Sequence, residues 1–423
     1  MMANKIYTVA ILGVGARGGD VYGRLLLDFK DKFKIVALCD KRKERLERFS
    51  EIFGVDKKST FTDENEFFKV KRADMLLIAT QDKDHYGHMM KAFDKGYDVM
   101  VEKPLTASVK ECKDLIEAQK KHGAKALVCH VLRYAPAFVK VGELLREGKI
   151  GKLVAIDALE RVAFWHQAHS YVRGNWRNTD VAMPMILAKC CHDLDLLQYY
   201  ADSKAVSVSS VGDNSYFKPE CKPDGAANRC TDCAYKDTCK YSAKRIYIDR
   251  WEKADKPEDI WPYNVIAPAP VDEKKLYEAI EKGPYGRCVF ACDNNVVDHQ
   301  ITTITFENGV KASLTMTAYT YEGGRRYVFH GTEGELILDE SENLISVKRY
   351  FEEVQNINTE TLIADFGGYG HGGGDAVLIS TLYDVLSGNA DNRTSLERSV
   401  ESHLMGIAAE ESRVLGGELV KIR

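Results

Sequence analysis

Tyr7-Thr-Val-Ala-Ile-Leu-Gly13-Val-Gly15-Ala-Arg-Gly18 is the stretch of sequence that decides the fold. An apolar strand runs straight into a Gly-x-Gly-x-x-Gly turn, and a helical pattern follows it. In such a turn the first glycine permits a tight bend, the second lets the backbone approach a pyrophosphate, and the third lets helix and strand pack closely. We therefore expect a dinucleotide site that contains Gly13, Gly15, Ala16, Arg17 and Gly18.

A second apolar strand over residues 33–39 ends at Asp40. A carboxylate in this position hydrogen-bonds the ribose 2′-hydroxyl of NAD and repels the 2′-phosphate of NADP. The sequence therefore favours NAD. NADP remains the alternative, because an arginine in the following run Lys41-Arg42-Lys43 is able to clamp a phosphate.

Short apolar strands alternate with helices through the first part of the chain. Strands are expected at 75–79, 98–101 and 126–129, and helices at 42–53, 84–95 and 108–122. This alternation is typical of a parallel sheet that is covered on both faces. It predicts an α/β fold with a doubly wound Rossmann domain over residues 1–133.

The pattern changes in the remainder, residues 134–423. Longer strands with short turns are expected at 153–161, 300–307, 310–317, 327–330, 335–339 and 344–349, and Asn308-Gly309 is a hairpin signal. Two helices follow, at 376–386 and after Thr394, where Thr394-x-x-Glu397 predicts a capping box. We expect an α+β domain with a mostly antiparallel open sheet, which binds substrate and supports oligomerisation.

Composition limits the class of protein. The 423 residues are 45% hydrophobic and 29% charged with a net charge of −4, which gives no electrostatic reason to expect nucleic acid or a membrane surface as partner. No apolar run approaches the ~20 residues that span a bilayer. Residues 1–5 lack the apolar core of a secretory signal, so we expect a cytoplasmic protein. Apolar surface on an open sheet predicts a homo-oligomer, a dimer or a tetramer.

One segment, about 212–294, fits neither domain. It holds six of the 11 cysteines and seven of the 10 prolines, and it is expected to bury little apolar surface by itself. Cys221, Cys230, Cys233 and Cys239 match the four-thiolate count of a structural zinc site, and Cys288 and Cys292 are able to complete it. An iron–sulfur cluster and free thiols are the alternatives.

Glu102-Lys103-Pro104 stands at the end of the strand expected at 98–101. Ligands of doubly wound sheets bind at the carboxyl ends of the strands, so Lys103 is expected in the crevice beside the nicotinamide. Pro104 biases the residue before it to an extended backbone. The alternative is an exposed lysine in a strand-to-helix turn.

Lys189-Cys-Cys-His192-Asp-Leu-Asp195 is the second group of candidate residues. The spacing predicts that Lys189, His192 and Asp195 share one face of a helix. A neutral imidazole is suited to removing a hydroxyl proton while hydride leaves the same carbon, and a carboxylate one turn away is able to orient the ring. Ordinary polar residues of a helix are the alternative.

Aromatic and polar residues suited to a sugar gather near residues 165–177 and again before the helix at 376–386. The candidates for substrate contact are Trp165, His169, Trp176, Arg177 and His371. Aromatic rings stack on the apolar face of a pyranose, and imidazole or guanidinium groups bind its hydroxyls. A surface loop over packed aromatics explains the first group as well, and Asp375 after His371 is expected to act as a helix N-cap.

The order Gly-x-Gly-x-x-Gly, Glu-Lys-Pro and His-Asp-x-Asp resembles the Gfo/Idh/MocA family, named after glucose–fructose oxidoreductase, inositol dehydrogenase and a rhizopine-catabolism protein. The resemblance covers nearly the whole chain apart from the cysteine-rich segment. It implies an NAD(P)-dependent oxidoreductase that acts on a sugar, sugar derivative or cyclitol. Lys103 would then polarise the reacting oxygen, His192 would be the acid or base, and Asp195 would hold substrate. The implied cofactor contacts extend to Thr80, His85, Glu102, Lys103 and Arg133.

The sequence departs from the family at Ala188, where many members carry an aspartate four residues before the histidine, and Lys189 is placed to take over that role. Two other functions therefore stay open. Some relatives hold NAD tightly and cleave glycosidic bonds through transient oxidation. A non-catalytic nucleotide-sensing regulator is the third, which the retention of Lys103 and His192 disfavours.

Overall fold

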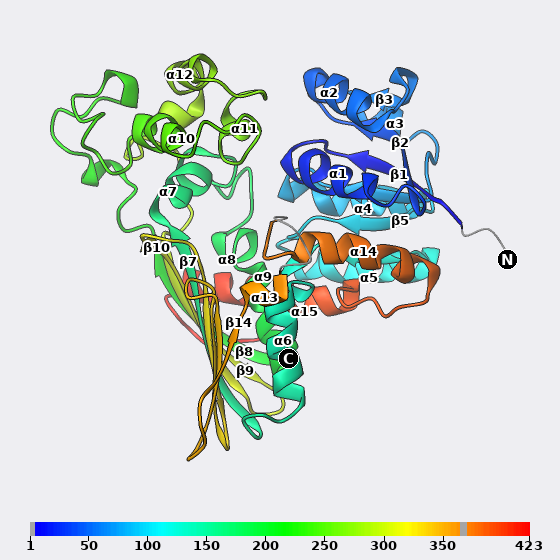
Figure 1. Cartoon of the computed structure of the whole chain (residues 1–423), viewed down its shortest axis with the longest axis vertical. Coiled ribbons are helices and arrows are strands. Elements are labelled where there is room, and N and C mark those ends of the chain that lie inside the picture. Colours follow the sequence, from blue (N-terminus) through cyan, green and yellow to red (C-terminus); the bar gives the residue numbers. More distant parts are fainter. Residues whose placement is uncertain (1–4, 364–369) are drawn as a thin grey trace.

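The computed structural model describes residues 5–363 and 370–423. Within those ranges, a six-stranded parallel sheet has the order β3-β2-β1-β4-β5-β6, so the order reverses between β1 and β4, where doubly wound sheets bind their ligands (Figure 1). Its strands are β1 (Tyr7–Leu12), β2 (Phe33–Cys39), β3 (Thr60–Phe61), β4 (Met75–Ile78), β5 (Asp98–Val101) and β6 (Ala126–Val128). The predicted Rossmann domain is confirmed.

Local sequence explains where the helices of this domain begin and end. The hydroxyl of Ser108 accepts the backbone N–H of Glu111 at 3.3 Å and caps the helix that follows, while Gly54 and Gly123 end two helices with φ of +65° and +62°. The turn over Ala16–Gly23 is wound as a π-helix. The α-helices are α1 (Arg24–Leu27), α2 (Lys43–Phe53), α3 (Glu64–Phe67), α4 (His85–Asp94) and α5 (Val109–His122).

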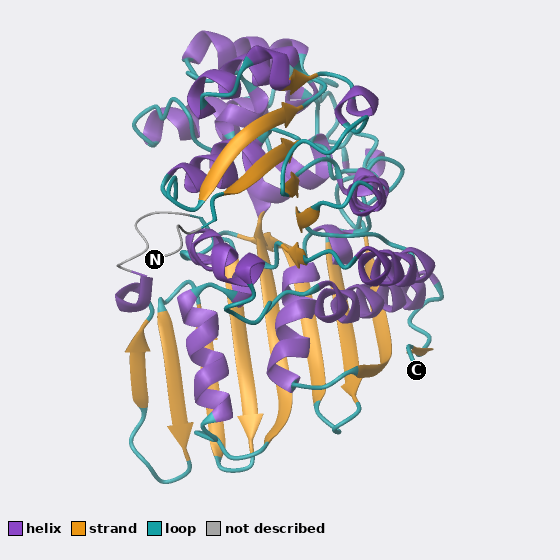
Figure 2. Cartoon of the chain, turned by 90° about the vertical axis from the view of Figure 1, so that its right-hand side faces the viewer, coloured by secondary structure: helices purple, strands orange, loops and turns teal. Residues whose placement is uncertain are grey.

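A second sheet, nine-stranded within the described ranges, has the order β14-β13-β12-β11-β7-β10-β9-β8-β15, and only the pair β7 and β10 is parallel. Figure 1 shows this sheet edge-on with helices along one side, and Figure 2 looks onto the side that the helices cover. The strands are β7 (Leu153–Ala163), β8 (Ala205–Asp213), β9 (His299–Phe306), β10 (Lys311–Thr320), β11 (Gly324–Gly331), β12 (Gly334–Asp339), β13 (Leu344–Arg349), β14 (Gln355–Asn358) and β15 (Val420–Lys421).

The mostly antiparallel open sheet is thus confirmed, and the Asn308-Gly309 turn joins β9 to β10 as expected. Sequence patterning missed β8, β14 and β15. The serine-rich strand β8 has a weak apolar alternation, and its long register with β9 places it in the sheet.

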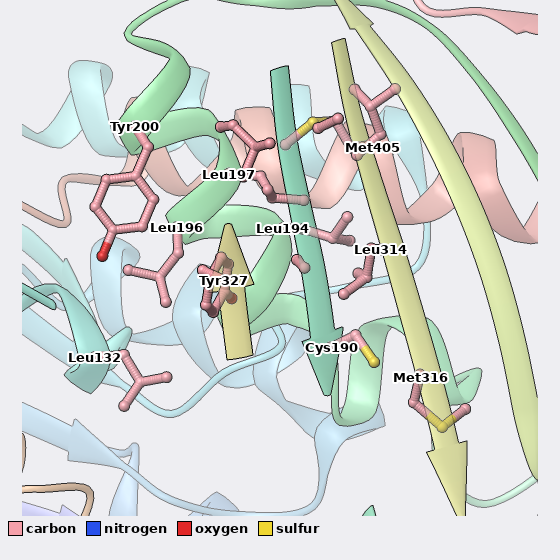
Figure 3. Packing of buried hydrophobic residues seen from close by; sticks show 14 of the residues in the cluster. Leu132, Cys190, Leu194, Leu196, Leu197, Tyr200, Leu314, Met316, Tyr327 and Met405 are labelled. Carbon is pink, nitrogen blue, oxygen red and sulfur yellow. The ribbon is translucent and has the colours of Figure 1, made fainter. Parts of the chain in front are cut away.

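The core beneath the sheet is built around α9 (Cys191–Ala201). Figure 3 shows Leu194 and Leu197 of this helix lying toward the strands that carry Leu314 and Met316, and these side chains are buried in one cluster. The helices α6 (Pro136–Arg146), α8 (Met185–Ala188) and α15 (Leu396–Val414) contribute to the same cluster. This packing holds the first turn of α9 directly below the nucleotide domain.

Two late helices also complete the nucleotide domain. The apolar residues Leu378, Ile379 and Leu382 of α14 (Gly374–Ser387) belong to the same buried cluster as Val9 and Ile11 of β1. The helix α14 lies beside α1, on the same face of the parallel sheet, although it follows the second sheet in sequence (Figure 1). The two domains therefore share helices.

The helix α15 begins one residue later than the predicted capping box requires. Its N-cap is Ser395, whose hydroxyl accepts the backbone N–H of Arg398 at 3.5 Å. The hydroxyl of Thr394 instead lies 3.1 Å from the hydroxyl of Tyr134, in the nucleotide domain. The tertiary contact outcompetes the local cap, so the prediction at Thr394 is wrong.

The segment between β8 and β9 has a core of its own, and the expectation that it buries little apolar surface is wrong. Large rings supply most of the buried area, because each buried aromatic removes a large apolar surface from water. The cluster includes Phe217, Tyr241, Tyr247, Trp251, Leu276 and Ile280. Short helices carry part of it: α10 (Arg250–Lys253), α11 (Tyr263–Ile266) and α12 (Glu273–Lys282).

This insertion also reaches the nucleotide domain. A carboxylate oxygen of Asp259 lies 3.2 Å from the guanidinium of Arg24 in α1 and 2.7 Å from that of Arg48 in α2. The insertion thus bridges from the second domain to the helices beside the glycine turn.

None of the helices in the described ranges combines the length and the apolar character needed to cross a bilayer. Residues 1–4, at the start where no secretory signal was expected, lie outside the described residues.

A buried ion network fixes α9 against the sheet. The guanidinium of Arg325 in β11 donates to Asp193 of α9 at 2.8 Å and forms an ion pair with Glu160 of β7 at 2.7 Å, and Tyr327 also donates to Asp193 at 2.7 Å. The ammonium of Lys189 lies 3.1 Å from Glu160. Burial raises the pKa of Glu160, although Arg325 and Lys189 act in the opposite direction.

We predict that Arg325→Met lowers the free energy of unfolding by about 3–5 kcal/mol, because it leaves two buried carboxylates without their shared cation. The matched change Tyr327→Phe removes one hydrogen bond from Asp193 and is expected to cost about 1 kcal/mol. Urea unfolding at pH 7 measures both. Equal losses for the two variants would contradict the assigned role of the guanidinium.

The imidazole of His403 joins α15 to the nucleotide domain: it accepts the backbone N–H of Leu105 at 2.8 Å, and its other nitrogen faces the carbonyl of Ser399 at 2.7 Å. Burial, reinforced by the nearby His130, lowers the pKa of His403 from 6.5 to about 3. The unfolded chain therefore takes up this proton before the folded protein does. Stability is lost as pH falls from 6.5 toward 3.

For this one group the expected loss between pH 7 and pH 5 is about 2 kcal/mol. The variant His403→Gln keeps an acceptor for Leu105 but does not titrate, so its free energy of unfolding should fall about 2 kcal/mol less than that of the wild type over the same interval. Urea unfolding at the two pH values tests this. A variant whose free energy of unfolding falls as much as that of the wild type would contradict this assignment.

Candidate active site

Sterics alone require glycine at two positions of the nucleotide turn, Gly13 and Gly18. Gly13 has φ of +91°, and a Cβ there would lie 2.5 Å from the carbonyl oxygen of Ala79 at the end of β4. A Cβ on Gly18 would collide with the carbonyl oxygen of Gly13. Near Gly15, a Cβ would lie 3.1 Å from the guanidinium of Arg45. The turn is thus closely packed on the strand side.

A cavity of about 440 Å³ lies at the carboxyl ends of β1, β2 and β4, and its walls include Gly13, Asp40, Thr80 and Arg177. The carboxylate of Asp40 accepts the backbone N–H groups of Val14 and Arg42, each at 2.9 Å. This cavity beside a glycine turn fits the adenosine part of a dinucleotide, with Asp40 placed for its ribose.

The amine of Lys103 crosses to the second domain. It stands beyond the end of β5 and donates to the carbonyl oxygen of Ala188 at 3.0 Å. Burial acts to lower the pKa of Lys103, but Cys191, Glu102 and Asp82 outweigh it and hold that pKa above its ordinary value. The amine therefore stays charged at neutral pH.

His192 lies in the first turn of α9 and is buried, and within the described residues its Nδ1 has no hydrogen-bond partner. Burial, followed by the nearby Lys103, His371 and Arg325, holds the pKa of His192 well below its usual value. The structure thus brings a charged amine and a neutral imidazole from the two domains into one electrostatic neighbourhood.

The single helix expected through Lys189, His192 and Asp195 is not formed, and that prediction is wrong. The helix α8 ends at Ala188 and α9 begins at Cys191. A continuous helix would pair the carbonyl of Ala188 with the N–H of His192, but this carbonyl accepts from Lys103 instead. Lys189 turns to Glu160, and Asp195 binds Arg133 at 2.6 Å.

Some of the other residues that were expected to contact the cofactor instead hydrogen-bond the loops around the site. Arg17 donates to Glu102 at 2.7 Å, and Tyr22 donates to the same carboxylate at 2.8 Å. The two ring nitrogens of buried His85 face the carbonyl oxygens of Pro104 at 2.7 Å and Thr80 at 3.2 Å. Arg133, paired with Asp195, is buried away from the 440 Å³ cavity.

The residues expected to bind substrate lie in different places and have different partners. The indole of Trp176 donates to Asp82 at 3.1 Å across the two domains, and Arg177 lines the nucleotide cavity while paired with Asp293 at 2.8 Å. Trp165 stacks under the guanidinium of Arg250, 3.5 Å from its ring centroid. These three residues lie where the insertion and the first domain approach each other.

His169 and His371 differ in what they face. His169 is buried and lies 2.9 Å from the hydroxyl of Tyr247 in the insertion core, where burial and Arg173 lower its pKa to about 3. The ring centroid of His371 lies 5.9 Å from that of His192. Asp375 is not the N-cap of α14, which is Gly373; its carboxylate binds Arg17 and His371 instead.

Sequence reasoning missed two histidines near the site. His130 follows β6 and is fully buried, within the described residues neither ring nitrogen has a hydrogen-bond partner, and its centroid lies 6.0 Å from that of His192. Burial, with Lys189, His169 and Lys103, holds the pKa of His166 well below its usual value. The position of His130 after a parallel strand was a signal for the site that the sequence already contained.

The predicted metal site is not formed. Among the described residues, no three His, Cys, Asp or Glu side chains are grouped so as to hold a metal ion. Cys230, Cys233 and Cys239 line a separate cavity of about 360 Å³ in the insertion, and Cys221 does not line it. The aromatic core described above stabilises the segment, so zinc is not needed to explain its fold.

Comparison with known proteins covers both domains. A family model described as an oxidoreductase family with NAD-binding Rossmann fold matches residues 7–130, and a model of the C-terminal alpha/beta domain of that family matches residues 142–420. YteT of Bacillus subtilis, which its name describes as an oxidoreductase, is 24% identical over 90% of this chain and 91% of its own length. A scyllo-inositol 2-dehydrogenase (NAD(+)) of the same organism is 28% identical over 48% of this chain and 56% of its own.

Solved structures agree on the fold. The WlbA dehydrogenase from Bordetella pertussis, in complex with NADH and UDP-GlcNAcA, superposes with a TM-score of 0.70 at 15% identity over 100% of this chain and 99% of that one. Because the two family models together span most of its length, the chain belongs to the Gfo/Idh/MocA family of NAD-binding oxidoreductases.

Proposed function

We propose that this protein is an NAD-dependent dehydrogenase that oxidises a secondary hydroxyl of a sugar, sugar derivative or cyclitol. The observation that carries the proposal is that the Lys103 amine, which is held charged and donates to the carbonyl of Ala188, lies near the neutral imidazole of His192 in the first turn of the following helix. The names of relatives, among them inositol dehydrogenases, support a polyol as the substrate class.

The charge states suit the two roles. The Lys103 ammonium donates a hydrogen bond to the reacting oxygen and stabilises negative charge on it. The neutral imidazole of His192 accepts the hydroxyl proton. Bound nicotinamide would supply the acceptor for the hydride from the same carbon. Because both side chains are removed from water, the interaction of Lys103 with the oxygen is stronger than it would be in solvent.

Asp40 supports NAD over NADP. Its carboxylate, held by two backbone N–H groups, stays at the cavity wall where a ribose 2′-hydroxyl would bind and a 2′-phosphate would be repelled. Arg45, with its guanidinium 3.6 Å from Asp40, offsets part of that repulsion. We therefore expect NAD to be preferred and NADP to be usable at higher concentration.

We also propose a homo-oligomer that uses the open face of the nine-stranded sheet. Val154, Val211 and Ile301 each expose about half of their surface on strands of that sheet: 51%, 49% and 48%. Sedimentation velocity should give a mass above that of one chain, and a monomer at micromolar concentration would contradict it.

Replacing Lys103 by Met or His192 by Gln is expected to lower kcat by about 10²–10⁴-fold, because each removes a group that acts on the reacting oxygen or its proton. NAD affinity should change little. NADH formation on a panel of sugars and cyclitols measures kcat, and fluorescence titration measures affinity. The control is Lys110→Met on the surface of α5. Normal turnover in the Lys103 and His192 variants would refute the proposed roles.

A glycoside-cleaving enzyme with retained NAD is the second candidate, favoured by the bridge from Asp259 to Arg24 and Arg48 beside the nucleotide turn. If this bridge retains the dinucleotide, denaturing the purified protein should release about one NAD(H) per chain. Stoichiometric release, with cleavage of an aryl glycoside and no accumulation of NADH, would favour this candidate. A cofactor-free preparation that forms NADH on a polyol would exclude it.

A further inference from the structure

The turn His371-Gly-Gly-Gly-Asp375 has an unusual backbone. His371, Gly372 and Gly373 have φ of +56°, +58° and +83°, all in the left-handed region. Glycine adopts this conformation freely, whereas a residue with a Cβ adopts it at a cost. A Cβ at Gly374 would collide with the carbonyl oxygen of Val131, directly after His130. Because a histidine is retained in this unfavourable conformation close to the candidate site, we infer that its side chain has a function.

Asp375 fixes the orientation of that side chain. It is fully buried, and its carboxylate is bound by two nitrogens of Arg17 at 2.7 and 3.2 Å and by Nδ1 of His371 at 2.9 Å. Burial acts to raise the pKa of Asp375, but Arg17 and His371 outweigh it, so the group is ionised. A carboxylate only accepts, so Nδ1 of His371 carries the proton and Nε2 is left as an acceptor.

His371 also lies near His192 and is the more exposed of the two. Its side chain is 36% exposed, while His192 is 5% exposed, and the two ring centroids are 5.9 Å apart. His192 is surrounded by cationic or protonatable groups, namely Lys103, Arg325, His130 and His371. A proton that arrives on His192 is therefore unfavourable there and has to leave.

We propose that His371 takes from His192 the proton that leaves the substrate hydroxyl and passes it to solvent, with Asp375 as its positioning residue. This inference rests on the proposed function. In the first transfer an O–H bond of the substrate breaks and an N–H bond forms on His192. In the second an N–H bond on His192 breaks as one forms on His371 Nε2, which then releases its proton to water. Only protonation changes in these transfers.

The guanidinium of Arg17 connects His371, the proposed proton acceptor, to the segment that carries Lys103. Arg17 donates to Glu102 through Nε and to Asp375 through its terminal nitrogens, and Glu102 precedes Lys103 in the chain. The position of the His371 imidazole and the position of the Lys103 backbone therefore depend on one half-buried cation, Arg17.

The variant His371→Gly tests the relay, because glycine fits the left-handed backbone and leaves room for a small base. We expect kcat on the responding polyol to fall about 10²-fold, with KM and NAD affinity within about twofold of wild type. Added imidazole should restore kcat in proportion to its concentration. The control is His330→Gln, which changes a half-buried histidine of β11 that is also paired with an aspartate, Asp157, at 3.0 Å.

A second measurement does not depend on turnover. Nitrogen-15 NMR of labelled protein should show that, in its neutral form, His371 is protonated on Nδ1 in the wild type. In Asp375→Asn this preference should be lost, and kcat should fall with little change in KM. A purely structural role for Asp375 would leave the tautomer unchanged.

The outcomes separate this inference from the proposed function. A wild-type protein that reduces neither NAD nor NADP with any polyol or sugar refutes the proposed function and the relay together. An active wild type with an unaffected His371→Gly variant refutes the relay alone. A fall in activity that imidazole does not restore, together with a raised KM, would make His371 a substrate ligand and would also overturn the relay.

Discussion

The guanidinium of Arg17 binds two carboxylates, Glu102 and Asp375, that come from distant parts of the chain. All three groups are largely removed from water, and a buried charge is stable only when it is paired and hydrogen-bonded. The first carboxylate stands at the end of β5 and the second at the start of α14. Because Arg17 belongs to the glycine turn, this one cation fixes the dinucleotide loop, the strand end with Lys103 and the late helix relative to one another.

The contact between Lys103 and Ala188 continues this arrangement into the second domain. It occupies a carbonyl that would otherwise extend α8, and the new helix α9 starts with His192 in its first turn. The network of Arg325, Asp193 and Glu160 then holds α9 on the sheet. The Lys103 amine and the His192 imidazole are thus positioned by buried polar and ionic contacts rather than by one rigid element, although they come from different domains.

Local patterns were sufficient for the strands around the glycine turn, the hairpin at Asn308-Gly309 and the two-domain α/β and α+β plan, because these depend on neighbours in sequence. They failed where a distant partner intervenes. Thr394 was predicted to cap a helix, but its hydroxyl hydrogen-bonds Tyr134. Asp375 was also predicted to be a cap, but its carboxylate binds Arg17.

The insertion is another region where prediction from local sequence failed. Its cysteines suggested a metal, whereas the aromatic rings that hold it together are scattered through the segment and have no regular period. His130 was missed although it follows a parallel strand, because its surroundings in sequence are apolar and only the fold places it beside His192.

The packing of α14 on β1 affects how the chain is made. Leu25 and Leu26 of α1 share a buried cluster with Leu378 and Leu382, so the nucleotide domain, which is synthesised before the second sheet, lacks one of its covering helices until α14 has also been synthesised. Its apolar face stays open to water, or to a chaperone, throughout that time. The nucleotide domain, although it precedes the second sheet in sequence, is therefore completed after it, and the contact between Arg17 and Asp375 forms only when α14 is in place.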